Sequence, residues 1–239
     1  MKGGIAAFVA AIRRFVQKGE LQGSISLIIT GDEEADAING TVKMVEWMNA
    51  SGHIPDFCIV GEPTNPNHLG DVIKHGRRGS LTGIVWITGT QGHVAYPHLA
   101  HSPVPALSHM MDIVNGCELD KGTVDFDPST AQIVDLHIPN SASNVIPETV
   151  FFQFNIRFNT AHSAESLQEM LEAHFKKTAQ QFDIDYHAEF SSNAAPFVTQ
   201  PGKLTQMMSK VIAAHTGKTP LLSTTGGTSD ARFICTLCD

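Results

Sequence analysis

The chain has 239 residues and a mass of 25.8 kDa, and its 42% hydrophobic and 17% charged content is ordinary for a globular protein. Its formal net charge of −8, with no lysine or arginine cluster, argues against a nucleic-acid partner. No apolar run is long enough to span a bilayer and no secretion signal opens the sequence, so we expect a cytoplasmic protein without a membrane partner. The four scattered cysteines fit a reducing compartment.

The first 78 residues alternate between helical and strand patterns. Apolar residues spaced three or four apart predict a helix over 1–18, which Gly19 ends. The apolar run at 24–30 predicts a buried strand, 41–49 a helix ending near Gly52, and 57–60 a second buried strand. This alternation is typical of an α/β layer arrangement, in which chemistry gathers where strands end.

Carboxylates follow both predicted strands. Asp32, Glu33 and Glu34 come directly after the first, and Glu62 follows the second in the sequence Gly-Glu-Pro-Thr. In a functional reading, one carboxylate binds a cation while its neighbour acts as a general base. The alternative is a solvated acidic turn, and an incidental glutamate in the second case. Neighbouring parallel strands lie about 5 Å apart, so Glu34 and Glu62 could converge on one cation.

From residue 79 the pattern changes to longer alternating strands. We predict strands over 80–88, 131–138, 150–159 and 184–190, with helices over 103–115 and 164–182. This β-α-β-β-α-β order is that of a split βαβ sandwich. A further helix over 204–216 and a glycine-rich loop suggest a return to the first domain. We therefore predict a catalytic domain formed by 1–78 and 192–239, with 79–191 inserted into it.

A loop with several histidines follows the first strand of the inserted domain. Gly92 precedes His93, and Tyr96, His98 and His101 lie within the next eight positions. A single histidine is more often structural than catalytic, yet functional residues concentrate in such loops. An imidazole there could donate a hydrogen bond to a developing oxyanion.

Basic residues at Lys74, Arg77 and Arg157 and the glycine-rich loop at 225–230 suggest an anion site. The alternative is solvated surface charge. Arginine binds carboxylates through two parallel hydrogen bonds, so a few arginines near a cleft of an acidic protein favour a small anionic substrate. The loop lacks the lysine and the spacing of a P-loop, which favours a carboxylate over a phosphate.

Several motifs occur in the order MKGG, TGDEEADA, VGEPT, KHGRRGS, GTQGHVAYPHLA, SNVIPE, FNIRF and GGTSDARF. Together they resemble the dinuclear zinc amidohydrolase/peptidase family M20 along essentially the whole chain. The resemblance implies an α/β catalytic domain, with a mixed sheet flanked by helices, and an inserted α+β ferredoxin-like dimerisation domain. KHGRRGS and GHVAYPHLA favour the branch that removes succinyl groups from a diaminopimelate precursor; the alternative is an acetylornithine deacetylase or another aminoacylase or carboxypeptidase.

The resemblance also implies roles for individual residues. Glu33 would be the general base, Glu34 and Glu62 would each bind one zinc ion, and His93 would reach the partner subunit's active site to stabilise the oxyanion. The following residues resemble those that hold the carboxylates and amide of the substrate: Lys74, Arg77, Ser80, Tyr96, Asn144, Arg157, Thr225 and Gly226.

By the same resemblance, a subunit would bind two zinc ions, with cobalt as an alternative, and act as a homodimer on a small anionic N-acyl amino acid. Of the five metal ligands of the family, only Glu34 and Glu62 have counterparts here. Since a catalytic zinc ion needs about three protein ligands, we expect this chain to be an internal segment that is inactive by itself. A non-catalytic dimerising segment is the alternative of a different class.

Overall fold

The structure, a computed structural model, describes residues 2–19, 21–33 and 37–238. The chain divides into two compact units. Unit 1 comprises Met1–Arg77 and Val198–Asp239, and unit 2 comprises Arg78–Phe197. No helix in the described part of the chain is both long and apolar enough to cross a membrane.

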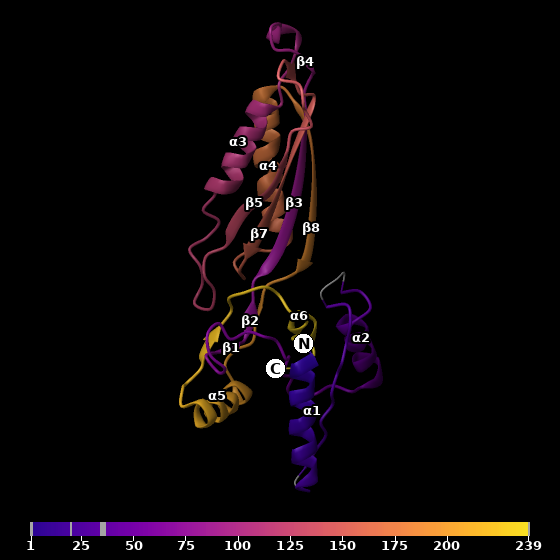
Figure 1. Ribbon diagram of the computed structural model, residues 1–239, viewed down its shortest axis with the longest axis vertical. Coiled ribbons are helices and arrows are strands. Elements are labelled where there is room, and N and C mark those ends of the chain that lie inside the picture. The colour runs from indigo at the N-terminus through magenta and orange to yellow at the C-terminus, as the bar shows by residue number, and fades with distance from the viewer. Residues whose placement is uncertain (1, 20, 34–36, 239) are drawn as a thin grey trace. The chain divides into compact units, whose positions relative to one another are not determined.

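Unit 2 is a four-stranded antiparallel sheet with two helices. Its elements in chain order are β3 (Gly79–Thr88), α3 (Val104–Gly116), β5 (Thr130–His137), β7 (Thr149–Phe158), α4 (Ala164–Phe182) and β8 (Asp185–Ala194). The strands lie in the order β5-β7-β3-β8, and all three pairs are antiparallel (Figure 1). The predicted β-α-β-β-α-β order of elements is confirmed.

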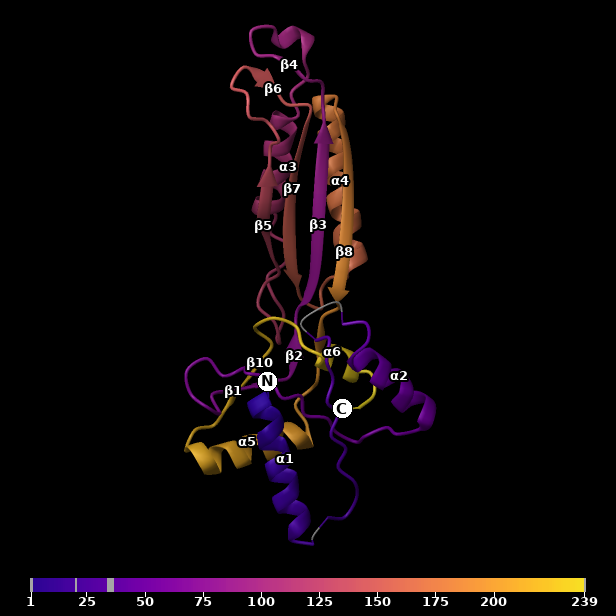
Figure 2. The same ribbon diagram turned by 45° about the vertical axis from the view of Figure 1, so that its right-hand side comes forward.

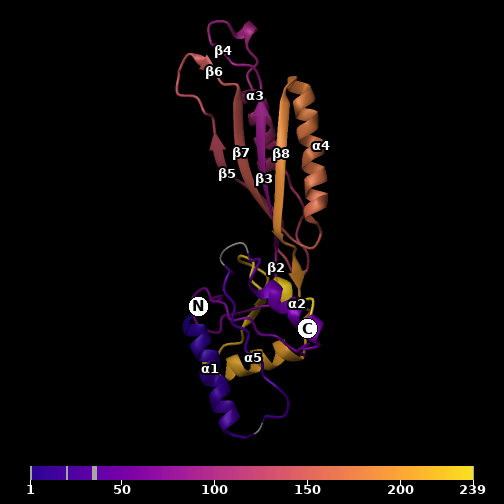
Figure 3. The same cartoon turned by 90° about the vertical axis from the view of Figure 1, so that its right-hand side faces the viewer.

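The core of unit 2 lies between this sheet and its helices. Burial alternates along the whole of β7, which places Phe152, Phe154 and Phe158 on the covered face. α3 and α4 lie against that face, and α4 contributes Phe175 (Figures 2 and 3). A side chain at Gly83 would overlap the ring of Phe154, so only glycine lets these strands pair around that ring. Burying each such apolar side chain stabilises the unit by about 1.5–3 kcal/mol.

α4 has a well-defined start and end. At its N-terminus, Ser163 and Ser166 form a reciprocal capping box, in which each side chain accepts a hydrogen bond from the backbone N–H of the other. Asp183 ends the helix in the left-handed conformation, with φ of 51°. Its bounds are those expected from the sequence, because capping and a 3.6-residue apolar period agree there.

The loop between α3 and β5 is organised by one carboxylate. Asp120 Oδ1 accepts hydrogen bonds of 2.7 Å from the Gly122 N–H and from the Asn159 side-chain amide. Asp120 Oδ2 lies 3.2 Å from both the Ser129 backbone nitrogen and His162 Nε2. Burial by itself would raise the pKa of Asp120, but bonds from Ser129, Gly122 and Asn159 outweigh it and lower the pKa to about 2.

Unit 2 also contains three short elements beyond its sheet. These are β4 (Gly92–His93), the 3₁₀ helix η1 (Pro97–Leu99) and β6 (Val145–Ile146). β4 and β6 pair antiparallel, which brings His93 opposite Val145.

Unit 1 contains four helices and a small ladder among its described residues. The helices are α1 (Lys2–Gln17), α2 (Thr41–Ser51), α5 (Lys203–Thr216) and α6 (Ala231–Ile234). The ladder is formed by β1 (Val72–Lys74) and β10 (Leu221–Ser223), which pair in parallel with Lys74 opposite Ser223. Two further strands, β2 (Gly76–Arg77) and β9 (Phe197–Val198), lie where the chain passes from one unit to the other.

The strands predicted over 24–30 and 57–60 are wrong, because neither segment forms a strand in the structure. A run of β-branched residues becomes a strand only when a neighbouring strand completes its hydrogen-bond ladder, and the described residues supply no such neighbour. Their apolar side chains are correspondingly exposed: Ile25 by 45%, Ile29 by 60% and Ile59 by 48%. The protein is a mixed α/β structure, but the strands described in unit 1 form only two-stranded ladders, β1 with β10 and β2 with β9 at the boundary of the unit.

Candidate functional site

The acidic loop lies between Thr30 and Thr41, and the structure describes it at residues 31–33 and 37–40, where its two ends meet. Asp32 adopts the left-handed conformation, with φ of 66°, and its Oδ2 accepts hydrogen bonds from the Ile38 and Asn39 N–H groups at 2.8 and 2.9 Å. A side chain at Gly40 would overlap the carbonyl oxygen of Gly31, so the two ends of the loop touch. Asp32 therefore shapes the loop that presents Glu33, which is half-buried.

The expected metal ligands cannot be placed as a pair. Glu34 lies outside the described residues, and Glu62 is half-buried in the loop before β1. Within the described part of the chain, no three histidine, cysteine, aspartate or glutamate side chains lie close enough together to hold a metal ion. These residues therefore do not assemble a zinc site, which would need about three ligands.

Two basic side chains meet the glycine-rich loop in unit 1. Lys74 Nζ donates to Ser223 Oγ at 2.9 Å and to Thr225 Oγ1 at 2.6 Å. Arg77 Nη1 donates to the carbonyl oxygen of Thr225 at 2.9 Å. The parallel pairing of β1 with β10 is what brings them together, because it places Lys74 directly beside Ser223. Gly226 follows with φ of +97°, a conformation that glycine adopts without strain.

The electrostatics of this pair favour an anion. Burial, and after it the nearby charge of Arg77, lowers the pKa of Lys74. Burial also lowers the pKa of Arg77, and the charge of Glu62 partly opposes that effect. Arg77 is 6% exposed, and its Nε has no hydrogen-bond partner among the described residues. Two cations held side by side with an unused buried donor can bind a carboxylate.

In unit 2, His93 and Asn144 lie on the paired segments of β4 and β6. The Ala95 N–H donates to His93 Nδ1 at 3.0 Å, so the neutral ring carries its hydrogen on Nε2. His93 Nε2 lies 3.3 Å from the side-chain amide nitrogen of Asn144; turning that amide by 180° presents its oxygen to the Nε2 hydrogen. Tyr96 lies beside His93, with 5.9 Å between the ring centroids. His93 is thus held as a donor through Nε2.

Ser80 and Arg157 lie on adjacent strands of the sheet in unit 2. They are direct partners in the register of β3 and β7. The side-chain amide of Asn155 donates to Ser80 Oγ at 3.1 Å and to Thr82 Oγ1 at 2.9 Å. The bond to Ser80 fixes the orientation of its hydroxyl. Asn155 was not predicted as a site residue, although it lies two positions before Arg157 in the FNIRF motif.

The structure therefore groups the predicted residues into separate sets. Unit 1 brings together Lys74, Arg77, Thr225 and Gly226; unit 2 brings together His93, Tyr96 and Asn144, and places Ser80 next to Arg157. Thr41 and Asp230, which join the acidic loop to the end of the glycine-rich loop, were not predicted. Asp230 belongs to the GGTSD motif, whereas no motif includes Thr41.

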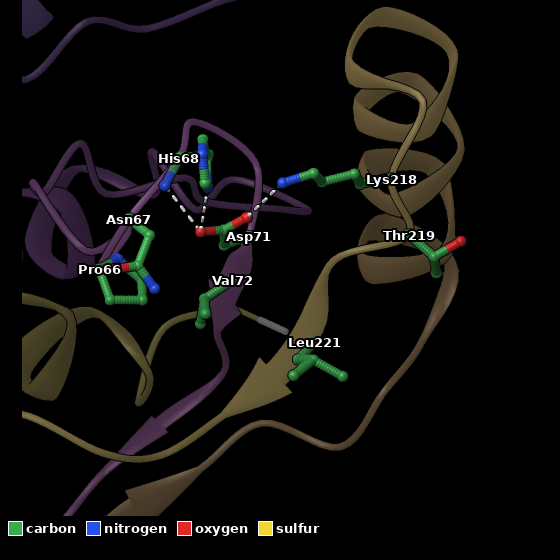
Figure 4. A pocket seen from close by; sticks show the side chains of 8 residues that line it. All are labelled: Pro66, Asn67, His68, Asp71, Val72, Lys218, Thr219 and Leu221. Carbon is green, nitrogen blue, oxygen red and sulfur yellow. Dashed lines mark hydrogen bonds and ion pairs between the residues drawn. The ribbon is translucent and has the colours of Figure 1, made fainter.

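A hollow of about 420 Å³ beside the β1–β10 ladder contains none of the predicted site residues. It is lined by Pro66, Asn67, His68, Asp71, Val72, Lys218, Thr219 and Leu221 (Figure 4). The His68 N–H donates to Asp71 Oδ2 at 2.7 Å, and Lys218 Nζ lies 3.5 Å from Asp71 Oδ1. The His68 N–H, followed by the charge of Lys218, lowers the pKa of Asp71. The Asp71 carboxylate therefore stabilises the turn that contains it.

Comparison with known proteins shows relatives along the whole chain. The family model described as peptidase family M20/M25/M40 matches residues 1–237. Proteins named succinyl-diaminopimelate desuccinylase from Rhodospirillum centenum and Gluconobacter oxydans are 49% and 47% identical over 98% and 100% of this chain. The chain spans 60% and 62% of their lengths.

Among solved structures, the fold is similar to that of an aminopeptidase PepT from Bacillus cereus, with a TM-score of 0.72 and 19% identity. That match covers 98% of this chain and 59% of the other. A tripeptidase from Staphylococcus aureus matches with a TM-score of 0.58 and 17% identity, over 83% of this chain and 59% of the other. At these identities the likeness shows the fold alone.

Proposed function

Because the chain belongs to peptidase family M20/M25/M40, we propose that the protein containing it hydrolyses the amide of N-succinyl-L,L-diaminopimelate to succinate and L,L-diaminopimelate. Relatives with 45–49% identity, all named succinyl-diaminopimelate desuccinylase, support this substrate. Cys58, Cys117 and Cys235 are free thiols, which is consistent with a cytoplasmic reaction.

The observation that carries the proposal is the pair of cations on the Thr225 loop. The substrate has three carboxylates and no cationic group beyond a single amine. Lys74 and Arg77, fixed by Ser223 and Thr225, offer one of those carboxylates two positive charges. Glu62 is one negative charge near two positive ones, so a neutral acyl substrate would leave an excess of positive charge at the pair, and the pair favours a polyanionic substrate over an apolar one.

The remaining residues take roles in the same reaction. Glu33 accepts a proton from the attacking water, and the Nε2–H of His93 donates to the oxyanion that forms on the amide carbonyl. His93 would serve the active site of the partner subunit, with Asn144 and Tyr96 beside it. Ser80 and Arg157 would hold a further carboxylate and the amide. Glu34 and Glu62 would bind the two zinc ions, or cobalt in their place, that the resemblance implies. The described residues do not by themselves assemble that site.

A comparison of substrates tests this function. We expect the protein in its full length to hydrolyse N-succinyl-L,L-diaminopimelate with a kcat/KM at least about a hundredfold above that for N-acetylornithine, because N-acetylornithine has one carboxylate in place of three and leaves a cation of the site unpaired. The amine released from each substrate can be measured by the same colorimetric assay. An equal or higher kcat/KM for the acetylated substrate would replace the proposal with a deacetylase.

We also propose that the protein forms a homodimer through unit 2. β5 lies at one edge of the sheet, and its segment exposes Val134 by 57%, Leu136 by 47% and Ile138 by 40%. Exposed apolar side chains along an edge strand favour pairing with a second chain.

Light scattering after size exclusion tests the dimer. We expect twice the chain mass for the unmodified protein and a shift toward the single-chain mass for Val134→Lys, which adds charge at the edge. Val124→Lys is the matched control, because Val124 is 98% exposed and lies in the loop before β5, outside the strand itself. A monomer before substitution, or a Val134→Lys protein that is still fully dimeric, would contradict pairing through β5.

A further inference from the structure

Three polar side chains from distant parts of unit 1 form one chain of hydrogen bonds. Thr30 Oγ1 lies 3.1 Å from Thr41 Oγ1, and Thr41 Oγ1 donates to Asp230 Oδ2 at 2.6 Å. Thr41 and Asp230 are buried, with exposed fractions of 4% and 7%. The link joins positions 189 residues apart in the sequence. It therefore ties together segments that local structure alone would leave independent.

The direction of these bonds follows from the number of hydrogens. A threonine hydroxyl has one hydrogen, and an ionised carboxylate only accepts. Since Thr41 donates its hydrogen to Asp230, Thr30 must donate to Thr41. The carboxylate thus stands at the end of a one-way series, and removing the Thr41 hydroxyl breaks both bonds at once.

This series spans the ends of the acidic loop. Thr30 immediately precedes Gly31 and Thr41 immediately follows Gly40, the two glycines whose backbones touch. Within the loop, Asp32 accepts the Ile38 and Asn39 N–H groups. The Thr30–Thr41 bond joins the two residues that flank the loop, and Asp32 joins its two ends from within. Glu33 directly follows Asp32, so its position depends on both sets of bonds.

The other end of the series lies on the glycine-rich loop. Asp230 stands four residues after Gly226 and five after Thr225, which holds Lys74 and Arg77. One carboxylate is therefore connected both to the loop that carries the proposed base and to the loop that carries the anion site.

Asp230 depends on Thr41 for this connection. Its second oxygen, Oδ1, is buried and has no hydrogen-bond partner among the described residues. A buried carboxylate without a donor is strongly disfavoured, so loss of the Thr41 hydroxyl would make the segment around Asp230 rearrange.

We propose that Thr41, with Asp230, is a positioning residue that holds the acidic loop, and with it Glu33, in the orientation required for proton transfer. The catalytic consequence rests on the proposed function, because that is what assigns Glu33 its role. Displacement of a catalytic group by about 1 Å costs up to about a hundredfold in rate, so one hydroxyl far from the reacting atoms can affect turnover.

The test compares Thr41→Val, which removes the hydroxyl at nearly constant shape, with Thr41→Ser, which keeps it. In the full-length protein, we expect Thr41→Val to lower kcat by about tenfold to a hundredfold with a much smaller change in KM, and Thr41→Ser to restore most of it. Thr219→Val is the control for loss of a threonine hydroxyl, because Thr219 is exposed in unit 1 (Figure 4).

Amide hydrogen exchange gives a readout that needs no turnover. We expect the Ile38 and Asn39 amides to exchange faster in Thr41→Val than in the unmodified and Thr41→Ser proteins, while amides of β3 in unit 2 are unchanged. Unchanged exchange at Ile38 and Asn39 in Thr41→Val would overturn the proposal, as would an unchanged kcat. If the unmodified protein hydrolyses no N-acyl substrate, the proposed function fails, and the exchange measurement still decides whether Thr41 holds the loop.

Discussion

Replacing Glu33 with glutamine in the full-length protein is expected to lower kcat by about 10²- to 10⁴-fold, the usual contribution of a general base. Glutamine keeps the shape and the hydrogen-bonding reach of glutamate but cannot take a proton from water. The acidic loop should keep its form, because Asp32, not Glu33, accepts the Ile38 and Asn39 N–H groups that close it. Steady-state kinetics with the succinylated substrate would measure the change.

The matched control is Glu46→Gln, on the exposed side of α2. Glu46 pairs with Lys43 at 2.9 Å, with both side chains more than half exposed, and such surface pairs contribute little. We expect its kcat to stay within about twofold of the unmodified protein. A Glu33→Gln protein that retains more than a third of the unmodified kcat would remove Glu33 from the role of base.

The largest effect on stability is expected at Asp120. Asp120→Ala would leave the Gly122 N–H, the Ser129 N–H and the Asn159 amide without their shared acceptor. Removing one side of a buried charged network costs about 3–5 kcal/mol, so we expect unit 2 to lose about that much free energy of unfolding. Urea denaturation in a Trp47→Phe background measures this, since Trp86 in β3 then reports on unit 2.

The same carboxylate predicts how stability depends on pH. The pKa of Asp120 is lowered from 3.8 to about 2 in the folded chain. Because this pKa is lower in the folded chain than in the unfolded chain, the ionised Asp120 carboxylate adds about 2 kcal/mol to the free energy of unfolding. This contribution is fully present above pH 4 and is lost as the pH falls toward 2. We expect this acid-induced loss to be absent in Asp120→Ala.

Glu169→Ala is the control, because Glu169 is an exposed carboxylate of α4 in the same unit. Glu169→Ala should change the free energy of unfolding by no more than about 0.5 kcal/mol at neutral pH. An Asp120→Ala protein as stable as this control would contradict the role assigned to the carboxylate.

The elements predicted well were those whose pattern and local chemistry agree. α4 begins at a serine cap and β7 alternates over ten residues, so both have nearly the expected bounds. The segments at 24–30 and 57–60 have equally apolar runs, but a strand also needs a neighbour, and local pattern contains no information on that. β1 and β10, at three residues each, are too short to produce a pattern.

The residues of the candidate site also fall into those that local sequence predicts and those that it does not. Lys74, Arg77 and Thr225 were predicted as separate residues, and the structure supplies the hydrogen bonds that join them. Thr41 and Asp230 could not be paired from sequence, because nothing local relates residues 189 positions apart. The environment of Asp120 is similarly assembled from segments far apart in the sequence: Gly122 and Ser129 contribute backbone N–H groups, which any residue but proline has, and Asn159 contributes its side-chain amide.

The hydrogen bonds on Lys74 and Arg77 have a consequence for affinity. Each of these long side chains has about 2 kcal/mol of rotamer entropy to lose when it is fixed by a ligand. Ser223 and Thr225 already hold both in one arrangement, so most of that loss occurs during folding. An arriving carboxylate would meet a preorganised pair and retain more of its gross interaction energy as binding free energy.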